Sequence, residues 1–275
     1  MRGRGIALGM PGLALAAGAG LWSQARKVAN APLPKFDDHD ASGRYGALEG
    51  TPIRIDALGD SSMTGPGLAH GSHVWIAQLA DLLPWRVELR SHAKGGSRVR
   101  DVLLRQAPRS LADPPDLFVL AVGANDTLHG TPRPLFSRDL EALLELLRTV
   151  APVVTLGIGD LSVIPRLPAT LRPIVSLRSA MVDRWHQEVT SGRDGVVRIP
   201  VPELSDHHFR VGGRRLFTED LFHPNREGHA MWAQLFEPFV SSAMSDRGSA
   251  TTVDLRDGSR RLEQLVRAHV LSTTP

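Results

Sequence analysis

Serine, histidine and aspartate, which together can transfer an acyl group, occur at two distant places in the chain. Ser61 follows a short apolar run in Leu58-Gly59-Asp60-Ser61-Ser62. Asp220 and His223 stand close together in Thr218-Glu219-Asp220-Leu221-Phe222-His223-Pro224. A serine nucleophile needs a base, and the base needs an orienting group. We therefore expect Ser61 to be the nucleophile, His223 the general base and Asp220 the group that orients the base.

Two further polar clusters contain the hydrogen-bond donors that acyl transfer requires. The tetrahedral intermediate carries a negative oxygen, which must be held by donors in fixed positions. The backbone N–H groups of Ser61 and Gly96 can serve, because glycine allows a close approach; Gly95 is the alternative to Gly96. The side-chain amide of Asn125, in Gly123-Ala124-Asn125-Asp126, is the third expected donor.

The pattern of apolar residues predicts the elements that position these clusters. Strands alternate with amphipathic helices from residue 51 onwards, which predicts parallel pairing with right-handed crossovers in a layered α/β domain. Ligands bind at the carboxyl ends of the strands in such sheets, so we expect all four polar clusters at that rim. The expected strands lie at 53–58, 86–91, 116–122, 153–158 and 196–199, and the expected helices at 72–83, 99–111, 137–149, 171–190 and 225–244.

Each cluster also has a simpler explanation when it is taken alone. Gly-Asp-Ser makes ordinary turns, Asn125-Asp126 and Asp220 could cap helices, and His223 could be a surface histidine. The joint presence of four clusters at one rim favours catalysis. We expect Asp60 only to organise its turn by accepting bonds from backbone N–H groups, and Asp126 to act likewise.

In order and spacing these motifs resemble those of the SGNH hydrolase family, also called the GDSL esterases and lipases. The four residues that name this family have counterparts here: Ser61, Gly96, Asn125 and His223. The resemblance extends over about residues 53–240. It implies an α/β, three-layer flavodoxin-like fold with a five-stranded parallel sheet, helices on both faces and a Ser-His-Asp triad.

The sequence departs from the family pattern in two places. Ser62 stands where the family name has leucine, and His92-Ala93-Lys94 precedes the glycine turn, where the family often has an asparagine. Neither departure removes a catalytic group. Both bear on the local shape of the loops around the nucleophile.

The family resemblance implies an ester hydrolase that works through an acyl-enzyme on Ser61, with no metal and no cofactor. Two alternatives stay open: an O-acyltransferase that uses the same triad, and a non-catalytic binding module on the same fold. The expected partner is a small-molecule, lipid or acylated-sugar ester. The loops at 63–71, 127–135 and 159–170 are expected to shape its pocket, but they specify neither the acyl chain nor the alcohol. Oligomeric state is not predicted.

Composition excludes several other classes of protein. Four of the 32 basic residues lie in the first 27 positions, where there is no acidic residue, so the rest of the chain has 28 basic and 29 acidic side chains. A nucleic-acid-binding body would carry a basic excess, and no nucleic-acid partner is expected. There are no cysteines, which excludes disulfides and cysteine–zinc sites. His207 and His208 are expected to be solvated loop residues and not zinc ligands, while Trp185 and Trp232 are expected to pack within helical patterns.

The N-terminal segment resembles a targeting sequence. Arg2 and Arg4 precede uncharged residues 5–22, a pattern typical of a signal peptide or of a membrane anchor within residues 1–27; a non-targeting apolar helix is the third alternative. The first two place the body outside the cytoplasm, secreted or anchored, and residues 5–22 would then be available to associate with a membrane. The third leaves a cytoplasmic location open. The remaining predicted segments are a linker at 28–50, the SGNH hydrolase domain at 51–245, and a C-terminal extension at 246–275 with a short amphipathic helix.

Overall fold

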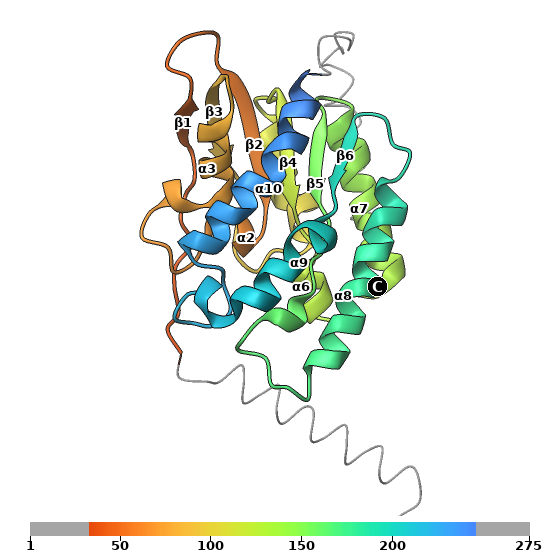
Figure 1. The fold of residues 1–275 in the computed structure, drawn as a ribbon. Coiled ribbons are helices and arrows are strands. Elements are labelled where there is room, and N and C mark those ends of the chain that lie inside the picture. Colours follow the sequence, from red (N-terminus) through yellow and green to blue (C-terminus); the bar gives the residue numbers. More distant parts are fainter. Residues whose placement is uncertain (1–32, 246–275) are drawn as a thin grey trace, which may run out of the picture.

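The computed structural model describes residues 33–245, which fold around one central sheet (Figure 1). The sheet has six strands in the order β1-β3-β2-β4-β5-β6. Strands β2 to β6 pair in parallel, as predicted. Their order, with the first parallel strand between the second and the third, is that of a flavodoxin-like sheet. The strands span Gly43–Gly46 (β1), Ile53–Gly59 (β2), Arg86–Ser91 (β3), Leu117–Ala121 (β4), Val153–Leu156 (β5) and Val196–Ile199 (β6).

The sixth strand, β1, was not expected. It lies within the segment predicted as a linker and pairs antiparallel with β3 at the edge of the sheet. It was not predicted because its two glycines and its polar Arg44 are residues typical of loops. A short, partly polar strand of this kind suits a sheet edge, where it need not bury both faces.

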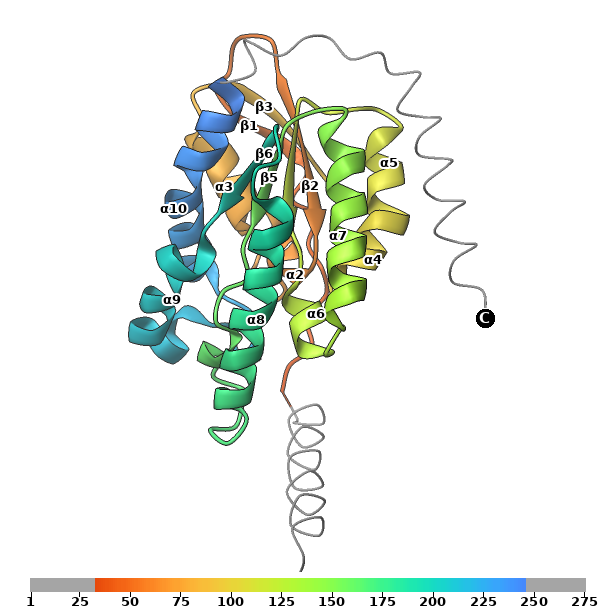
Figure 2. The same ribbon diagram turned by 90° about the vertical axis from the view of Figure 1, so that its right-hand side faces the viewer.

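Helices cover both faces of the sheet, so the predicted three-layer α/β fold is confirmed (Figure 2). One apolar core lies between the sheet and α3 and α10. The other lies between the sheet and the helical segments α4, α5, α7 and α8. Strand β4 is buried along its whole length, as its unbroken apolar run predicts for a central parallel strand. The main helices span Trp75–Leu82 (α3), Val99–Asp101 (α4), Ala107–Leu111 (α5), Arg133–Arg148 (α7), Arg172–Thr190 (α8), Val201–Gly212 (α9) and Arg226–Ser245 (α10).

Helix α9 is the largest element that the sequence analysis missed. Its 12 residues begin at Val201, directly after the N-cap Pro200 that follows β6, and Pro200 and Pro202 flank the start, where a proline's missing N–H costs nothing. His207 and His208 are exposed on this helix and not in a loop. The other elements that were not predicted are short: α2 (Ser61–Thr64), α6 (Ala124–Leu128) and three 3₁₀ turns at Gly71–His73, Leu161–Val163 and Gly213–Leu216.

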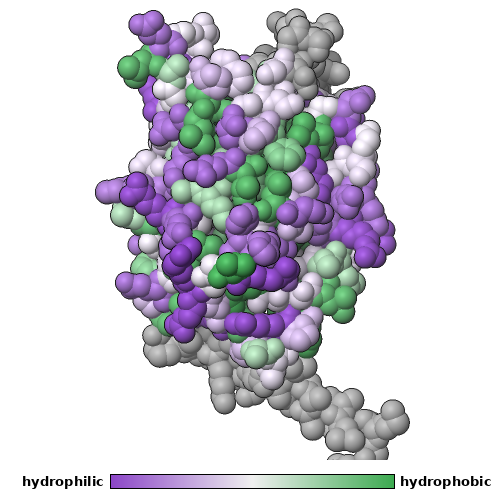
Figure 3. All heavy atoms as spheres, viewed as in Figure 1, coloured by the Kyte–Doolittle hydropathy of each residue, from purple (hydrophilic) through white to green (hydrophobic). Residues whose placement is uncertain are grey.

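Two of the predicted segments lie outside the described residues: the signal peptide or anchor at 1–27 and the extension at 246–275. Within residues 33–245, none of the helices has the length and apolarity needed to cross a membrane. The face seen in Figure 3 is mainly hydrophilic, with small apolar patches between the polar side chains.

A buried carboxylate ties β2 to β3. Asp56 is fully buried, and its Oδ1 accepts a bond from Arg90 Nε at 2.6 Å. Its Oδ2 pairs with His92 Nε2 at 3.0 Å and also accepts a short bond from the Ser110 hydroxyl. Arg90 has a second partner, the exposed Asp113. Because a buried charge is costly unless it is fully paired, this network fixes the register of the two strands.

We predict that Asp56→Ala lowers the free energy of unfolding by about 3 kcal/mol, because it leaves the partly buried Arg90 without its inner partner. Asp113→Ala is the matched control, since it removes the exposed partner of the same arginine and should change stability little. Urea denaturation of both variants measures the difference. Equal losses in the two variants would show that burial of Asp56 does not carry the effect.

Candidate active site

The polar clusters meet at the carboxyl ends of the central strands. Strand β2 ends at Gly59, whose φ is +153°, and a Cβ there would lie 2.1 Å from the backbone oxygen of Ala121 at the end of β4. Only glycine fits so close to the neighbouring strand. Gln106 holds the same residue from the other side, accepting from the Gly59 N–H at 2.8 Å and donating to its carbonyl at 2.9 Å. The chain is thus fixed one residue before the turn that carries Ser61.

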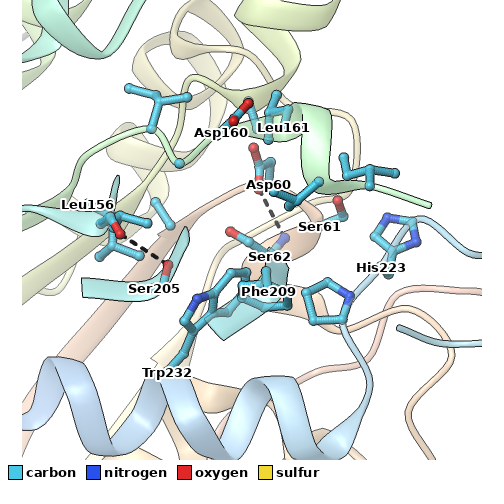
Figure 4. Close-up of a pocket in the computed structure, with 18 of the residues that line it drawn as sticks. Asp60, Ser61, Ser62, Leu156, Asp160, Leu161, Ser205, Phe209, His223 and Trp232 are labelled. Carbon is cyan, nitrogen blue, oxygen red and sulfur yellow. Dashed lines mark hydrogen bonds between the residues drawn. The ribbon is translucent and has the colours of Figure 1, made fainter. Parts of the chain in front are cut away.

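Asp60 caps the short helix α2, in which Ser61 is the first residue. Its Oδ1 accepts a bond from the Ser62 N–H at 3.0 Å, so the predicted turn-organising role of Asp60 is confirmed. In Figure 4 this bond is drawn beside Ser61. The Ser61 N–H lies at the free N-terminal end of α2, where helix N–H groups have no partner within the helix.

The structure separates the two glycines that were considered as donors. The Gly95 N–H donates to Asp38 Oδ2 at 2.9 Å, so it is already engaged. Gly96 is exposed, has a φ of +80°, and a Cβ there would meet no atom within 4 Å. The space on the Cβ side of Gly96 is therefore open, although Gly96 is not among the residues that line the cavity described below.

Asn125 is held in α6 by two contacts of its side-chain nitrogen. Nδ2 donates to the carbonyl of Ser97 at 3.1 Å and to Asp60 Oδ2 at 3.3 Å. The first contact links Asn125 to the glycine turn, and the second links it to the turn of Ser61. Asp126 accepts from the Val99 N–H at 3.0 Å and so organises the same region, as expected.

Asp220 and His223 are positioned together in a closed loop. The loop begins and ends where Phe217 and Pro224 form an isolated β-bridge. Asp220 Oδ1 accepts bonds from the Thr218 hydroxyl and from the backbone N–H groups of Phe222 and His223, at 2.7, 2.8 and 3.0 Å. Its Oδ2 lies 2.6 Å from His223 Nδ1. This carboxylate therefore shapes the loop and orients the imidazole at once.

The bonds to Asp220 also set its charge. Burial acts to raise the pKa of this carboxyl, but the bonds from His223, Thr218 and Phe222 outweigh it and hold the pKa well below its usual range. Asp220 is therefore ionised at all pH values at which the protein would work. An ionised acceptor at Nδ1 keeps the proton on that nitrogen and leaves Nε2 of His223 free to accept another.

The pKa of Asp60 is shifted in the opposite direction, upwards. Asp60 is almost completely buried, and burial raises its pKa to about 6, against the lowering effect of its bonds from Ser62 and of nearby His223. Its neighbour Asp126 is raised by burial as well. The carboxyls of Asp60 and Asp126 thus hold protons more tightly than ordinary aspartates do, whereas the carboxyl of Asp220 holds its proton less tightly.

A cavity of about 150 Å³ opens at this rim (Figure 4). Ser61, Asn125 and His223 all line it, so the structure brings together three of the residues that the sequence singled out; Asp220 lies directly behind His223. Of the three loops expected to shape the pocket, those at 127–135 and 159–170 contribute lining residues. The loop at 63–71 contributes none among the described lining residues.

Several lining residues were not expected from the sequence. Phe209, Ser205 and Asp206 come from α9, which was not predicted as a helix. Trp232 of α10 was expected only to pack; it does pack against Phe209, at 5.3 Å between ring centroids, but it also forms part of the cavity wall. The 3.6-residue repeat could not separate these two roles, because a side chain between core and cavity satisfies both.

Residues 33–245 contain no group of three or more His, Cys, Asp or Glu side chains arranged to hold a metal ion. The arrangement that is present consists of a serine, an imidazole oriented by a carboxylate, and free N–H donors beside the serine. These groups can carry out nucleophilic acyl transfer by themselves.

Comparisons with known proteins identify a related family of enzymes. The sequence profile of the GDSL-like lipase/acylhydrolase family matches residues 57–231. A search of curated proteins finds no match.

Solved structures share the fold at low sequence identity. A lipolytic protein of the G-D-S-L family from Veillonella parvula is 17% identical, with a TM-score of 0.56 over 67% of this chain and 96% of its own. The acetylxylan esterase Axe2 from Geobacillus stearothermophilus is 14% identical, with a TM-score of 0.53 over 70% of this chain and 95% of its own. The psychrotrophic esterase EstA from a Pseudoalteromonas species is 19% identical, with a TM-score of 0.54 over 70% of this chain and 98% of its own.

The raised pKa of Asp60 predicts a pH-dependent contribution to stability. Between the unfolded value of 3.8 and the folded value of about 6, the folded chain binds more protons at Asp60 than the unfolded chain does. The free energy of unfolding should therefore fall as pH rises through this window and level off above it.

Asp60→Asn removes this titration while keeping an acceptor for the Ser62 N–H. Its stability relative to the natural chain should therefore rise between pH 4 and pH 7, by up to about 3 kcal/mol. Urea denaturation at four pH values in this range measures the difference. A difference that does not change with pH would rule out an elevated pKa at Asp60.

Proposed function

The chain belongs to the GDSL-like lipase/acylhydrolase family and is a carboxylic ester hydrolase, and from this premise we propose that it cleaves its substrate through an acyl-enzyme on Ser61, with His223 as the general base and Asp220 as its orienting acid. The observation that carries the proposal is the 2.6 Å contact between Asp220 and His223 Nδ1, with His223 and Ser61 on the wall of one cavity. The esterases among the similar structures support the reaction class.

The first half of the reaction begins when the Ser61 hydroxyl attacks the ester carbonyl. His223 Nε2 takes the hydroxyl proton, and the ionised Asp220 stabilises the imidazolium that forms. His223 then gives this proton to the leaving alcohol oxygen. In the second half, water attacks the acyl-enzyme with His223 again as base, and the acid product leaves.

The oxyanion of each tetrahedral intermediate is held by the N–H groups of Ser61 and Gly96 and by the Asn125 amide. The bond from Asn125 to Ser97 keeps this amide in place. Its second hydrogen is held by Asp60 only at 3.3 Å, which is long for such a bond. The oxyanion can therefore compete with Asp60 for this hydrogen as negative charge develops there.

Ser61→Ala should lower kcat for a short-chain chromogenic ester at least 1000-fold, because it removes the nucleophile. Ser62→Ala is the matched control, since Ser62 is the next residue and lines the same cavity; its kcat should stay within about threefold of the natural enzyme. A phosphonate inhibitor should also form a covalent adduct that peptide mass spectrometry assigns to Ser61. Full activity of Ser61→Ala, or an adduct on Ser62, would refute the assignment.

Asp220→Asn should lower kcat on the order of 1000-fold or more. The asparagine oxygen can still accept from the loop N–H groups, but its amide would face Nδ1 and force the proton onto Nε2, where it blocks the base. The melting temperature should stay close to that of the natural enzyme, and the fold-change in KM should be much smaller than that in kcat. Glu219→Gln, at the exposed neighbouring position, should leave kcat unchanged. A variant Asp220→Asn with normal kcat would show that His223 does not depend on this carboxylate.

A further inference from the structure

The cavity next to Ser61 has a defined size. Its volume of about 150 Å³ is that of a cavity that can hold one benzene molecule, about six carbon atoms. An acetyl group would leave most of it empty, and a long fatty acyl chain would extend beyond it.

The wall of the cavity is apolar over most of its extent. Aliphatic and aromatic side chains come from the end of β5 and the loop after it, from α9 and from the loop that carries His223. They are Leu156, Ile158, Leu161, Ile164, Phe209 and Phe222. A wall of this kind favours a hydrocarbon group, because burying one methylene strengthens binding by a factor of about four.

Three polar side chains in the wall, those of Asp206, Asp160 and Ser205, have partners within the protein, whereas the buried Nε1 of Trp232 in the same wall has none among the described residues. Both carboxylate oxygens of Asp206 accept from the Asp160 N–H, at 3.0 and 3.1 Å. Asp160 itself pairs with Arg210 at 3.2 Å. The Ser205 hydroxyl donates to the Val201 carbonyl at 3.1 Å. The side chains of Asp206, Asp160 and Ser205 therefore do not require a polar ligand.

The direction of the cavity identifies which half of an ester would enter it. Figure 4 shows His223 on one side of Ser61, and Leu156, Ser205 and Trp232 on the other. The leaving oxygen must face His223, because it receives its proton from that side chain. The acyl group of a substrate bound to Ser61 must then extend the other way, between Trp232 and Leu161 towards Ser205.

We propose that this cavity is the acyl-binding site, that it takes an uncharged hydrocarbon acyl group of about four to eight carbons, and that Ser205 at its inner end limits the chain length. This inference rests on the proposed function of Ser61 and His223. It distinguishes the chain from an esterase adapted to acetyl groups, because an acetyl group would leave the apolar wall unused.

The test is a series of p-nitrophenyl esters, which vary the acyl chain from acetate through butyrate, hexanoate and octanoate to decanoate with one leaving group. For the natural enzyme, kcat/KM for hexanoate should exceed that for acetate at least tenfold and should fall again at decanoate. An enzyme that hydrolyses acetate as fast as hexanoate would overturn the proposal while leaving the proposed function intact. If none of the esters is hydrolysed, the proposed function fails, and this inference fails with it.

Variants at Ser205 test directly whether this residue limits the length of the acyl chain. Ser205→Leu fills the inner end, so kcat/KM for hexanoate should fall at least tenfold while the value for acetate stays within threefold. Ser205→Ala shortens this side chain and should not lower kcat/KM for hexanoate, so that a loss in Ser205→Leu is due to the added volume. Because Ser205 is buried, retained acetate activity also reports that the leucine variant folds.

A second variant that narrows the cavity, placed outside α9, shows whether the effect of Ser205→Leu comes from the smaller cavity or from a local change in α9. Val163→Phe adds a ring from the turn at Leu161–Val163, outside α9, at a lining position that is only half-buried, and it should shift the preference towards acetate in the same way. Unchanged hexanoate activity in both narrowing variants would overturn the proposal.

Discussion

The site depends on one buried carboxylate. Asp220 accepts bonds from the Thr218 hydroxyl, from two backbone N–H groups and from the His223 ring, all within three residues of itself. These bonds keep it ionised in spite of burial, and an ionised carboxylate is what holds the imidazole with Nε2 free. The same bonds close the loop, so the orientation of the base and the fold of its support have one cause. They also hold Leu221 at a φ of +57°, a conformation that a leucine adopts only when its surroundings impose it.

The second constraint is the close approach of two strands. At Gly59 the backbone of β2 comes so near to the end of β4 that no Cβ fits. This contact brings the turn of Ser61 beside the segment that carries Asn125, and a side-chain bond from Asn125 to Asp60 joins them. The early segment before the sheet takes part as well, since Asp38 binds both Thr64 and Gly95. By engaging Gly95, it leaves Gly96 as the glycine with a free N–H.

The proposed acyl-binding wall comes from a different part of the chain than the proposed catalytic residues do. The reacting groups stand on short turns after β2 and β4 and before α10, whereas most of the cavity wall comes from the loop after β5 and from α9. A substitution in that wall therefore leaves the turns that carry Ser61 and His223 unchanged. This separation is expected on an α/β sheet, where the loops at the carboxyl rim vary while the sheet holds them in place.

The sequence alone determined the five parallel strands, most of the long helices and the four polar clusters, because apolar periodicity and glycine-rich turns are local signals. The same local signals missed β1, whose pairing depends on a distant edge of β3, and α9, whose start at two prolines does not have a typical capping residue. Only the tertiary structure decided that Trp232 lines a cavity, that Gly95 is engaged while Gly96 is open, and how large the space beside Ser61 is. Each of these depends on which segments approach one another through space, and that is set by packing across the whole sheet and not by the residues nearby in the chain.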